Sequence, residues 1–442
     1  MSVSDFHWGV SSAAAQTEGA ILEDGKGASI WDEFSKNRKK ISDGSNTFYG
    51  TDFYHRYRED IDIIKTLHIP NFRFSISWPR ILPDGTGTIN SKGVDFYNKV
   101  IDYCLEKKIT PWVTLYHWDL PANLEQKGGW TNRAIINWFN EYVTVCCEHF
   151  GDRVKNWMVL NEPLAFTGAG YFLGVHAPGK RGLQNFVAAA HHAVLANASG
   201  ASIIRSTVEK AYIGTTLSLS MVTPYSNSQK NIEAAEKVNQ LLNNFFLHPI
   251  LGMGYPLKKL KFLNRIEEVI QAGDESRMKA DLDFIGVQSY TREVVKYSWL
   301  TPFIKATMVS AKKRNAPFTE MGWEVFPESI YHTLKELSKI PKIPPIIITE
   351  NGAAFTDVLL PDGTIKDTKR KEYFQHHIEQ VLKAKSEGVN IKGYFAWSLT
   401  DNFEWAEGYR PRFGLVHIDY ENNFKRTIKE SGKYYSELIL KK

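Results

Sequence analysis

Two glutamates in the 442-residue chain follow apolar runs and stand directly before residues that end regular structure. Glu162 follows the run W-M-V-L-N and precedes Pro163. Proline disfavours the helical region for the residue before it, so we expect an extended backbone at Glu162. Glu350 follows I-I-I-T and precedes Asn351-Gly352, a dipeptide suited to positive φ and hence to an abrupt turn. Both carboxylates are therefore expected at the carboxyl ends of buried strands.

Two convergent carboxylates are the groups that cleave a glycosidic bond, where one acts as the acid and the other as nucleophile or base. A single glutamate at a strand end more often only faces water, but two at equivalent positions favour one shared site. A metal site would be the competing use, but the chain contains no H-E-x-x-H. His191-His192 and His376-His377 are adjacent pairs on predicted helices, about 100° apart around each helix, so we expect no metal. Serine hydrolase chemistry lacks its G-x-S-x-G motif.

Tryptophan is frequent, with 12 residues, and several stand beside polar residues near expected strand ends. These are Trp118, Trp323, Trp397 and Trp405. A sugar presents apolar C–H faces and hydroxyl edges, so tryptophan walls beside Asn, Gln, His and Glu side chains suit its binding. Core packing is the alternative, and we prefer it for Trp112, Trp138 and Trp157, which lie inside predicted strands or helices.

Short apolar runs alternate with segments whose apolar residues recur at helical spacing, which is typical of a parallel sheet covered by helices. The strand candidates are residues 8–10, 71–78, 111–116, 156–161, 211–218, 283–290, 345–349 and 391–398. The helix candidates include residues 54–67, 94–105, 134–150, 186–204, 232–246, 329–337 and 373–385. Some strand candidates are almost continuously apolar, as expected for strands that are buried on both faces.

This alternation predicts the α/β class and a (β/α)8 TIM barrel, one domain over residues 1–442 with inserted loops. Active sites of such barrels form at the carboxyl ends of the strands, and Glu162 and Glu350 are expected at the fourth and seventh strands. The alternative is an open doubly wound sheet, but the G-x-G-x-x-G turn after its first strand is missing. The poorly patterned stretch 292–318 is interpreted as a solvated loop rather than a functional lid.

Composition is that of a globular protein, with 43% hydrophobic and 23% charged residues. The formal net charge of +5 comes from interspersed charges, and no dense basic block indicates nucleic-acid binding. The cysteines, Cys104, Cys146 and Cys147, suggest neither a disulfide framework nor a zinc site and fit a reducing compartment. The chain has no signal-peptide pattern and no run of about 18 apolar residues, so we expect a cytoplasmic protein that does not bind a membrane.

Beyond these separate signals, ordered motifs along nearly the whole chain resemble glycoside hydrolase family 1, the retaining β-glycosidases. The matching motifs are F-H-W-G-V-S-S-A-A-A-Q-T-E-G (6–19), F-R-F-S-I-S-W-P-R (72–80), T-L-Y-H-W-D-L-P (114–121), N-E-P (161–163), H-A-P-G (176–179), I-T-E-N-G (348–352), W-S-L-T-D-N-F-E-W (397–405) and R-F-G-L (412–415). N-E-P alone is weak evidence, whereas the ordered set is very specific. The resemblance implies a (β/α)8 barrel and double-displacement hydrolysis with retention, without a cofactor.

The resemblance also implies roles for individual residues. Glu350 matches the family's nucleophile, and Glu162 matches its acid/base. Arg73 and Tyr290 match groups that hydrogen-bond the nucleophile. The residues that match sugar-contacting positions are Gln16, His117, Trp118, Asn161, Glu404 and Trp405 for the nonreducing sugar, Trp397 as the platform beneath its ring, and Trp323 as the stacking residue on the leaving-group side. Asn161 is the group expected to contact the sugar 2-hydroxyl.

Two positions depart from the family pattern. Val159 stands where threonine is common, and we expect it only to support its strand. Gln288-Ser289 replaces the common Asn-Tyr before Tyr290, which is expected to change hydrogen bonding near the acid/base and to open space beside the sugar. Glu404 argues against a phosphorylated sugar, because a carboxylate repels phosphate and suits neutral 4- and 6-hydroxyls.

The predicted activity is hydrolysis of terminal nonreducing β-linked sugars, with a β-D-glucoside favoured and a β-D-galactoside or β-D-fucoside as side substrates. The expected partner is therefore a small-molecule β-glycoside or oligosaccharide. Two alternatives stay open: a transglycosidase, which the Gln288-Ser289 departure does not exclude, and a noncatalytic sugar-binding relative, which the presence of both glutamates opposes. The preferred epimer, the natural leaving group and the oligomeric state, a homo-oligomer included, are left open.

Overall fold

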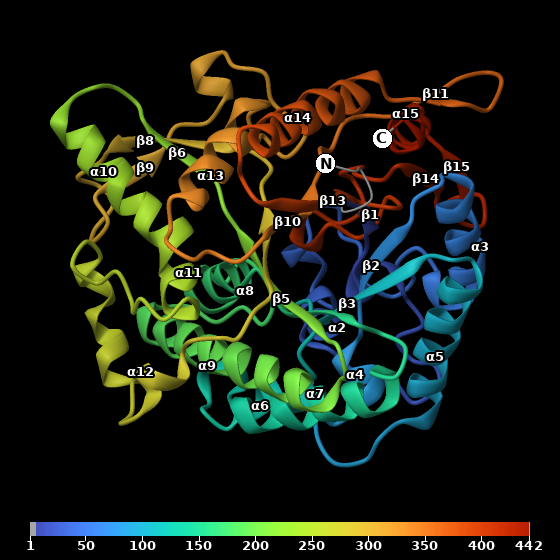
Figure 1. The fold of residues 1–442 in the computed structure, drawn as a ribbon, viewed down its shortest axis with the longest axis horizontal. Coiled ribbons are helices and arrows are strands. Elements are labelled where there is room, and N and C mark those ends of the chain that lie inside the picture. Colours follow the sequence, from blue (N-terminus) through green and yellow to red (C-terminus); the bar gives the residue numbers. More distant parts are fainter. Residues whose placement is uncertain (1–5, 442) are drawn as a thin grey trace.

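The computed structural model describes residues 6–441, and its centre is a closed barrel of parallel strands (Figure 1). The barrel strands are β1 (His7–Ser11), β2 (Asn71–Ser75), β3 (Thr110–Tyr116), β4 (Asn156–Asn161), β5 (Tyr212–Ser218), β7 (Phe284–Gln288), β10 (Ile346–Asn351) and β13 (Ile391–Trp397). They pair in chain order, and β13 closes the ring on β1. The predicted (β/α)8 barrel is confirmed, with Glu162 following the fourth barrel strand and Glu350 at the end of the seventh.

Helices surround the barrel (Figure 1). The longer ones are α3 (Phe53–Thr66), α5 (Ser91–Glu106), α7 (Ile135–Phe150), α9 (Leu183–Thr207), α10 (Gln229–Asn239), α13 (Glu328–Ser338), α14 (Thr368–Ser386) and α15 (Glu430–Leu440). Their sequences repeat apolar residues every three or four positions, which gives one buried face. In α7, for example, Phe139, Val143 and Phe150 are buried against the neighbouring layers.

Short elements complete the crossovers. The short helices are α1 (Ala14–Thr17), α2 (Ile30–Ser35), α4 (Trp78–Ile81), α6 (Ala122–Gln126), α8 (Pro163–Thr167), α11 (Phe245–Ile250) and α12 (Asp274–Arg277). The 3-10 and π turns are η2 (Arg38–Lys40), η3 (Gly129–Thr131), η4 (Gly168–Leu173), η5 (Gln240–Asn244), η6 (Lys261–Glu268), η7 (Lys312–Arg314) and η8 (Trp405–Glu407). The strands outside the barrel are β6 (Met221–Pro224), β8 (Arg292–Tyr297), β9 (Ala306–Met308), β11 (Val358–Leu359), β12 (Ile365–Lys366), β14 (Val416–Asp419) and β15 (Lys425–Ile428).

Two predictions about local structure were wrong. The strand expected over 71–78 ends at Ser75, and Trp78 begins α4, because an apolar run can equally belong to a short buried helix. The stretch 292–318 is not a plain loop, since its strands β8 and β9 form a side sheet with β6. Val295 on β8 packs with Val238 of α10 in a small apolar cluster, which fixes this sheet against the helix.

Helix α9 is long and apolar enough to cross a membrane by length and composition alone. However, 83% of its apolar window is buried inside the protein, and the helix packs against α7 and the barrel strands β4 and β5. An apolar surface covered on all sides is what a core helix requires. The composition of α9 is therefore explained by its place between the barrel and the outer helices.

The barrel interior is filled by side chains from different strands. Trp112, Met158, Phe284, Ile347 and Phe395 form one buried cluster there. The Trp112 ring lies 5.8 Å from that of Phe284 and 5.2 Å from that of Phe395. This filling makes the barrel a packed core rather than a channel, so polar chemistry is confined to its carboxyl-terminal mouth.

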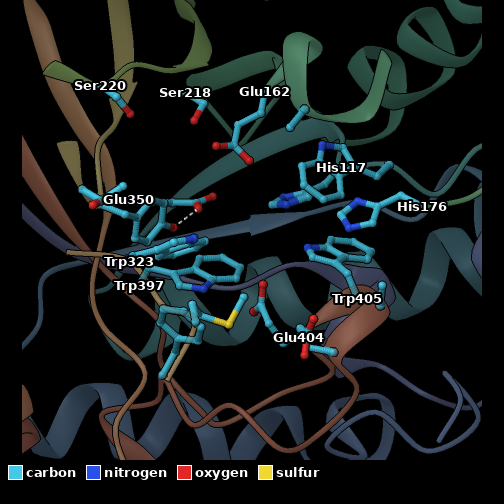
Figure 2. A pocket seen from close by; sticks show the side chains of 18 of the residues that line it. His117, Glu162, His176, Ser218, Ser220, Trp323, Glu350, Trp397, Glu404 and Trp405 are labelled. Atoms are coloured by element: carbon cyan, nitrogen blue, oxygen red, sulfur yellow. Dashed lines mark hydrogen bonds between the residues drawn. The ribbon is translucent and has the colours of Figure 1, made fainter. Parts of the chain in front are cut away.

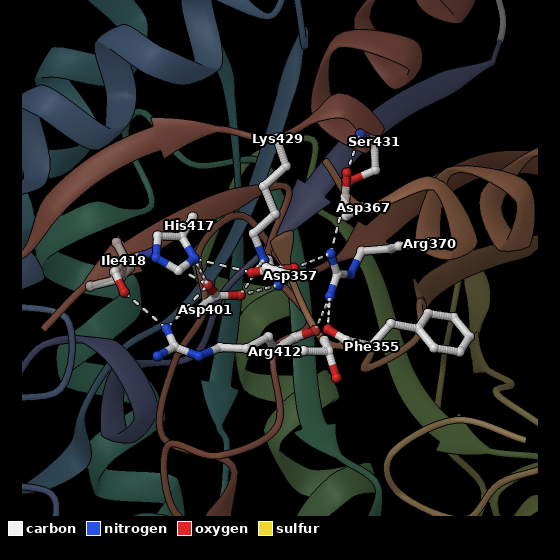
Figure 3. Close-up of polar contacts among 12 residues, drawn as sticks. Phe355, Asp357, Asp367, Arg370, Asp401, Arg412, His417, Ile418, Lys429 and Ser431 are labelled. Atoms are coloured by element: carbon white, nitrogen blue, oxygen red, sulfur yellow. Dashed lines mark hydrogen bonds and ion pairs between the residues drawn. The ribbon is translucent and has the colours of Figure 1, made fainter. Parts of the chain in front are cut away.

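A buried network of charges lies beside the mouth, between the chain after β10 and the C-terminal segment (Figure 3). The Lys429 ammonium donates to Asp357 at 2.7 Å and to Asp401 at 2.6 Å. The Arg370 guanidinium contacts Asp357 at 2.8 Å and Asp367 at 2.5 Å. Each carboxylate thus faces a cation, which is the condition for burying charge without a large cost in stability.

The same network contains three groups of the kind that bind metal ions. Ligand atoms of Asp357, Asp401 and His417 all lie within 4.8 Å of one another. The Lys429 ammonium is bonded to both of these carboxylates, so it neutralises the charge that a cation would otherwise neutralise. We therefore interpret the cluster as an ion-pair network that ties the chain segments after β10 and β13 to the C-terminal segment.

Replacing Lys429 by Met tests this interpretation, because Asp357 and Asp401 would stay buried with one cation fewer. We expect the free energy of unfolding, measured by denaturant titration, to fall by about 3–5 kcal/mol. Lys433→Met, at an exposed position in α15, is the matched control and should change stability by less than about 0.5 kcal/mol. Equal stabilities of the two variants would contradict the proposed pairing.

Candidate active site

A pocket of about 350 Å³ lies at the carboxyl-terminal mouth of the barrel (Figure 2). The predicted site residues that line it are His117, Trp118, Glu162, Tyr290, Trp323, Glu350, Trp397, Glu404 and Trp405. Gln16, Arg73 and Asn161 are fully buried, and they lie outside the lining. The structure therefore brings most of the predicted residues to one cavity and places these three behind its wall.

Glu350 has a hydrogen-bond donor on each carboxylate oxygen. Arg73 Nη1 donates to Oε1 at 2.5 Å, and the Tyr290 hydroxyl donates to Oε2 at 2.6 Å. Arg73, on β2, has 0% exposed surface, and a buried charge of this kind requires a paired anion. Glu350 supplies that anion and is held in one orientation by the two contacts.

Glu162 and Glu350 are both buried, but they differ in the charges and hydrogen-bond donors beside them. Burial, and then the charge of Glu350, raise the pKa of Glu162 to about 8. Burial also raises the pKa of Glu350, but the charge of Arg73 and the hydrogen bonds from Tyr290 and Arg73 oppose that rise. At neutral pH the proton therefore stays on Glu162 while Glu350 keeps the charge that pairs with Arg73. One protonated and one ionised carboxyl in the same pocket can act as acid and nucleophile.

The backbone at Glu162 is left-handed, with φ 45° and ψ 65°, so the expectation of an extended residue was wrong. Pro163 excludes only the right-handed helical region, and the left-handed region turns the chain directly into α8. Trp118 and Trp405 also have positive φ, at 74° and 51°. Each such residue costs about 1–3 kcal/mol, and this kind of strain clusters at functional sites.

The prediction for Asn351-Gly352 was also wrong in its reason, because neither residue has a positive φ. A Cβ atom on Gly352 would lie 1.8 Å from the carbonyl oxygen of Trp397, so only glycine allows these two backbone segments to approach so closely. The Asn351 side chain donates to the Ser289 carbonyl at 2.6 Å and accepts from the Tyr394 hydroxyl at 2.6 Å. This dipeptide thus joins β10 to both neighbouring strands just after Glu350.

The buried polar atoms around the pocket that have no hydrogen-bond partner among residues 6–441 include Gln16 Oε1, His117 Nδ1, His176 Nδ1 and Glu404 Oε2. Burial, and then the charge of Arg73, lower the pKa of His117 well below its usual value, so the ring is neutral. Its Nε2 lies 3.0 Å from Nδ2 of Asn161, which can only donate, and Nδ1 must then carry the ring hydrogen. Buried polar atoms require partners, and the hydroxyls of a sugar can supply both donors and acceptors.

Aromatic rings form the walls of the pocket. The rings of Trp118 and Trp405 lie 4.5 Å apart, and those of His117 and Trp397 lie stacked 6.0 Å apart. Trp323 contacts the Tyr290 ring, with centroids 5.2 Å apart. Figure 2 shows Trp323 and Trp397 near Glu350, and Trp405 on the side of His117. Flat apolar walls around unsatisfied polar atoms suit the faces and edges of a pyranose.

Asn161, at the end of β4, is fixed by three donors to one oxygen. Its Oδ1 accepts from Arg73 Nη2 at 2.6 Å, from Gln288 Nε2 at 2.6 Å and from Thr216 Oγ1 at 2.8 Å. A flipped amide would place its own N–H groups against the guanidinium, so this orientation is the only one that fits. The amide nitrogen therefore points toward His117.

The departures from the family pattern have different outcomes. The Gln288 amide donates to Asn161, the residue that precedes Glu162, so Gln288 takes part in the hydrogen bonding beside the acid/base. Gln288 and Ser289 are buried outside the lining of the pocket, and the expected extra space beside the sugar stays a prediction. Val159 is close to Gly200 of α9 and is fully buried, which fits a strand-supporting role.

The rest of the pocket lining consists of residues that were not predicted from the sequence as site residues. It includes His176, Ser218, Ser220, Thr291, Glu293, Met321 and Phe413. His176 belongs to the H-A-P-G motif, and Ser218 ends a predicted strand, so both carried a usable signal. Glu293 lies in the stretch that was interpreted as a solvated loop, and its place became visible only with the side sheet.

Comparison with known proteins agrees with this geometry. The family model described as Glycosyl hydrolase family 1 matches residues 2–442. Beta-glucosidase A of Thermotoga maritima is 46% identical and covers 98% of this chain and 96% of its own, and Beta-glucosidase A of Acetivibrio thermocellus is 43% identical with 98% and 97% covered. Solved structures of the T. maritima family 1 enzyme, including one in complex with glucoimidazole, align with a TM-score of 0.94 at 45% identity over 99% of this chain and 98% of theirs. The chain belongs to glycosyl hydrolase family 1.

Proposed function

We propose that this protein is a β-glucosidase that hydrolyses terminal nonreducing β-D-glucosides with retention, through a covalent glycosyl-enzyme. The observation that carries the proposal is the contrast between the two carboxyls of the pocket. Glu350 accepts from Arg73 and Tyr290, whereas the environment of Glu162 favours its protonated form. Relatives that are named beta-glucosidases and align over nearly the full chain support glucose as the sugar.

In the first step, a Glu350 oxygen attacks the anomeric carbon while Glu162 gives its proton to the glycosidic oxygen. The bond between that carbon and oxygen breaks, and the leaving group departs as a neutral alcohol. Tyr290 and Arg73 hold the attacking carboxylate in place, which reduces the motion needed to reach the transition state. The Trp397 ring lies in the pocket wall where it can support the sugar face.

In the second step, water replaces the bond to Glu350. Once Glu350 is an ester its negative charge is lost, and with it the main electrostatic cause of the high pKa of Glu162. Glu162, now ionised, accepts a proton from the attacking water, and the sugar leaves with its original anomeric configuration. The cycle ends with Glu162 protonated and Glu350 paired again with Arg73.

The unsatisfied atoms of Gln16, His117 and Glu404 are suited to the outer hydroxyls of the sugar, and Asn161 to its 2-hydroxyl. The described pocket lining contains no lysine or arginine, which a phosphorylated sugar would require. The transglycosidase alternative rested on Gln288-Ser289, and the position of these residues outside the lining gives it no further support. Hydrolysis of a neutral glucoside is the activity that gives each of these polar groups a hydroxyl to bind.

Replacing Glu350 by Gly tests the nucleophile. We expect kcat for 4-nitrophenyl β-D-glucoside to fall by roughly 10⁴-fold or more, because the covalent route is lost. Azide should restore turnover by occupying the vacated space, and NMR should identify the product as α-glucosyl azide. The wild-type enzyme, as control, should release β-glucose first. An unchanged rate for the variant would contradict the assignment of Glu350.

The pH dependence tests the acid. The pKa of Glu162 is raised to about 8, so kcat/KM should fall as the pH rises through this value and the acid loses its proton. In Glu162→Gln this alkaline limb should disappear, since no proton remains to be lost. Glu404 has a pKa raised to about 8 as well, and Glu404→Gln should keep the limb. A limb that persists in Glu162→Gln would assign it to another group.

Gln288→Ala tests the fixing of Asn161, because one of its three donors is removed. A lost hydrogen bond of this kind costs about 0.5–1.5 kcal/mol, so kcat/KM for a β-glucoside should fall about 2- to 12-fold. The loss should be smaller for the 2-deoxyglucoside, which lacks the hydroxyl that Asn161 is expected to contact. Gln271→Ala, at an exposed position, is the control. Equal losses on both substrates would show that Gln288 does not act through the 2-hydroxyl.

A further inference from the structure

The pocket continues beyond the residues that the proposed function uses. Besides Trp323, this second part of the lining carries the polar residues Ser218, Ser220, Thr291 and Glu293. Figure 2 shows Ser218 and Ser220 on the side of Glu162 and Glu350 that lies away from His117 and His176. The nonreducing sugar is assigned to the His117 side, so this part of the pocket is where the leaving group must lie.

Glu293 is built into the rim of this part by the side sheet. It lies on β8 and pairs in parallel register with Val222 of β6, and Ser220 stands directly before β6. The Ser220 backbone is held on both sides by the Asn243 side chain, at 2.9 Å through its N–H and at 2.8 Å through its carbonyl. Glu293 and Ser220 thus belong to one fixed edge rather than to a mobile loop.

The Glu293 carboxylate has no hydrogen-bond donor among the described residues, whereas the nearby Glu324 has two arginine donors. Glu324 accepts from Arg292 at 2.8 Å and from Arg314 at 2.6 Å. Burial raises the pKa of Glu293 to about 7, although the charge of Arg314 acts against the rise. A half-buried carboxyl whose nearby cations are already paired has unused capacity for hydrogen-bond donors.

The groups that face the leaving-group space have two kinds of chemistry. Trp323, with Met321 and Phe413, offers an apolar wall, while Glu293 and Ser220 offer a polar edge. A phenyl ring can stack on the wall but has no hydroxyl for the edge. A second sugar has both an apolar face and several O–H donors, so it can satisfy both surfaces at once.

We propose that Glu293 is a specificity-determining residue that accepts hydrogen bonds from the hydroxyls of a leaving group, so that it raises the preference of the enzyme for a sugar over an aryl leaving group. This inference rests on the proposed β-glucosidase function. It adds the carboxylate that distinguishes a hydroxylated leaving group from an aryl one.

The test compares two substrates that share the nonreducing glucose and differ in the leaving group, cellobiose and 4-nitrophenyl β-D-glucoside. For each enzyme the ratio of the two kcat/KM values is measured, so that losses common to both substrates cancel. We expect Glu293→Leu to lower the cellobiose-to-aryl ratio at least 10-fold, as loss of hydrogen bonds to a charged group implies. Glu293→Gln keeps the shape and one acceptor and should lower the ratio less.

Glu233→Leu, an exposed position on α10 that packs over the side sheet, is the matched control and should leave the ratio unchanged. A ratio in both Glu293 variants equal to that of wild type would overturn the inference while leaving the β-glucosidase proposal intact. Thermal unfolding of each variant identifies misfolding, and Glu293→Gln then decides the question if Glu293→Leu does not fold. Failure of the wild type to hydrolyse the aryl glucoside would instead refute the proposed function, and this inference with it.

Discussion

The fully buried charge of Arg73 is the constraint on which the arrangement of the pocket depends. Its guanidinium has no exposed surface and donates to Glu350 at 2.5 Å and to Asn161 at 2.6 Å. Its Nε donates to Thr114 Oγ1 and to the Met158 sulfur. A buried cation of this kind requires an anion beside it, so Glu350 is the carboxyl that stays ionised. A second buried carboxyl beside that anion then keeps its proton. Burial together with this ion pair therefore sets both protonation states that retaining hydrolysis needs.

The barrel and the pair of glutamates could be predicted because both follow from periodicity. Strands buried on both faces leave continuous apolar runs, and the residue that ends such a run in a barrel lies at the mouth. The bond from Gln288 to Asn161 could not be predicted, since it joins β7 to β4 through side chains 127 positions apart. The strands β8 and β9 were missed because they are short, and because their pairing with β6 and with each other and their packing on α10 are contacts between distant residues that a local pattern does not show.

Two kinds of support hold the mouth of the barrel. Beneath it, the aromatic and aliphatic cluster around Trp112 fills the barrel interior, and Met158 of this cluster contacts Arg73. Beside it, the ion pairs of Lys429 and Arg370 join the chain after β10 to the segment between β13 and Glu404. The first support consists of close packing of apolar side chains, and the second consists of ion pairs. Residues far apart in the sequence are thereby held at fixed positions around one cavity.

The contact between Gly352 and the Trp397 carbonyl also limits how the shape of the pocket can change during evolution. Main chain touches main chain there, so no exchange of side chains can widen the gap between the nucleophile strand and the sugar platform. The part of the rim that carries Ser220 and Glu293 is held by β6 and β8, which belong to a separate sheet and take no part in closing the barrel. Duplicated copies of such a gene could therefore acquire new leaving-group preferences by altering that outer sheet, while the geometry around the anomeric carbon is inherited unchanged.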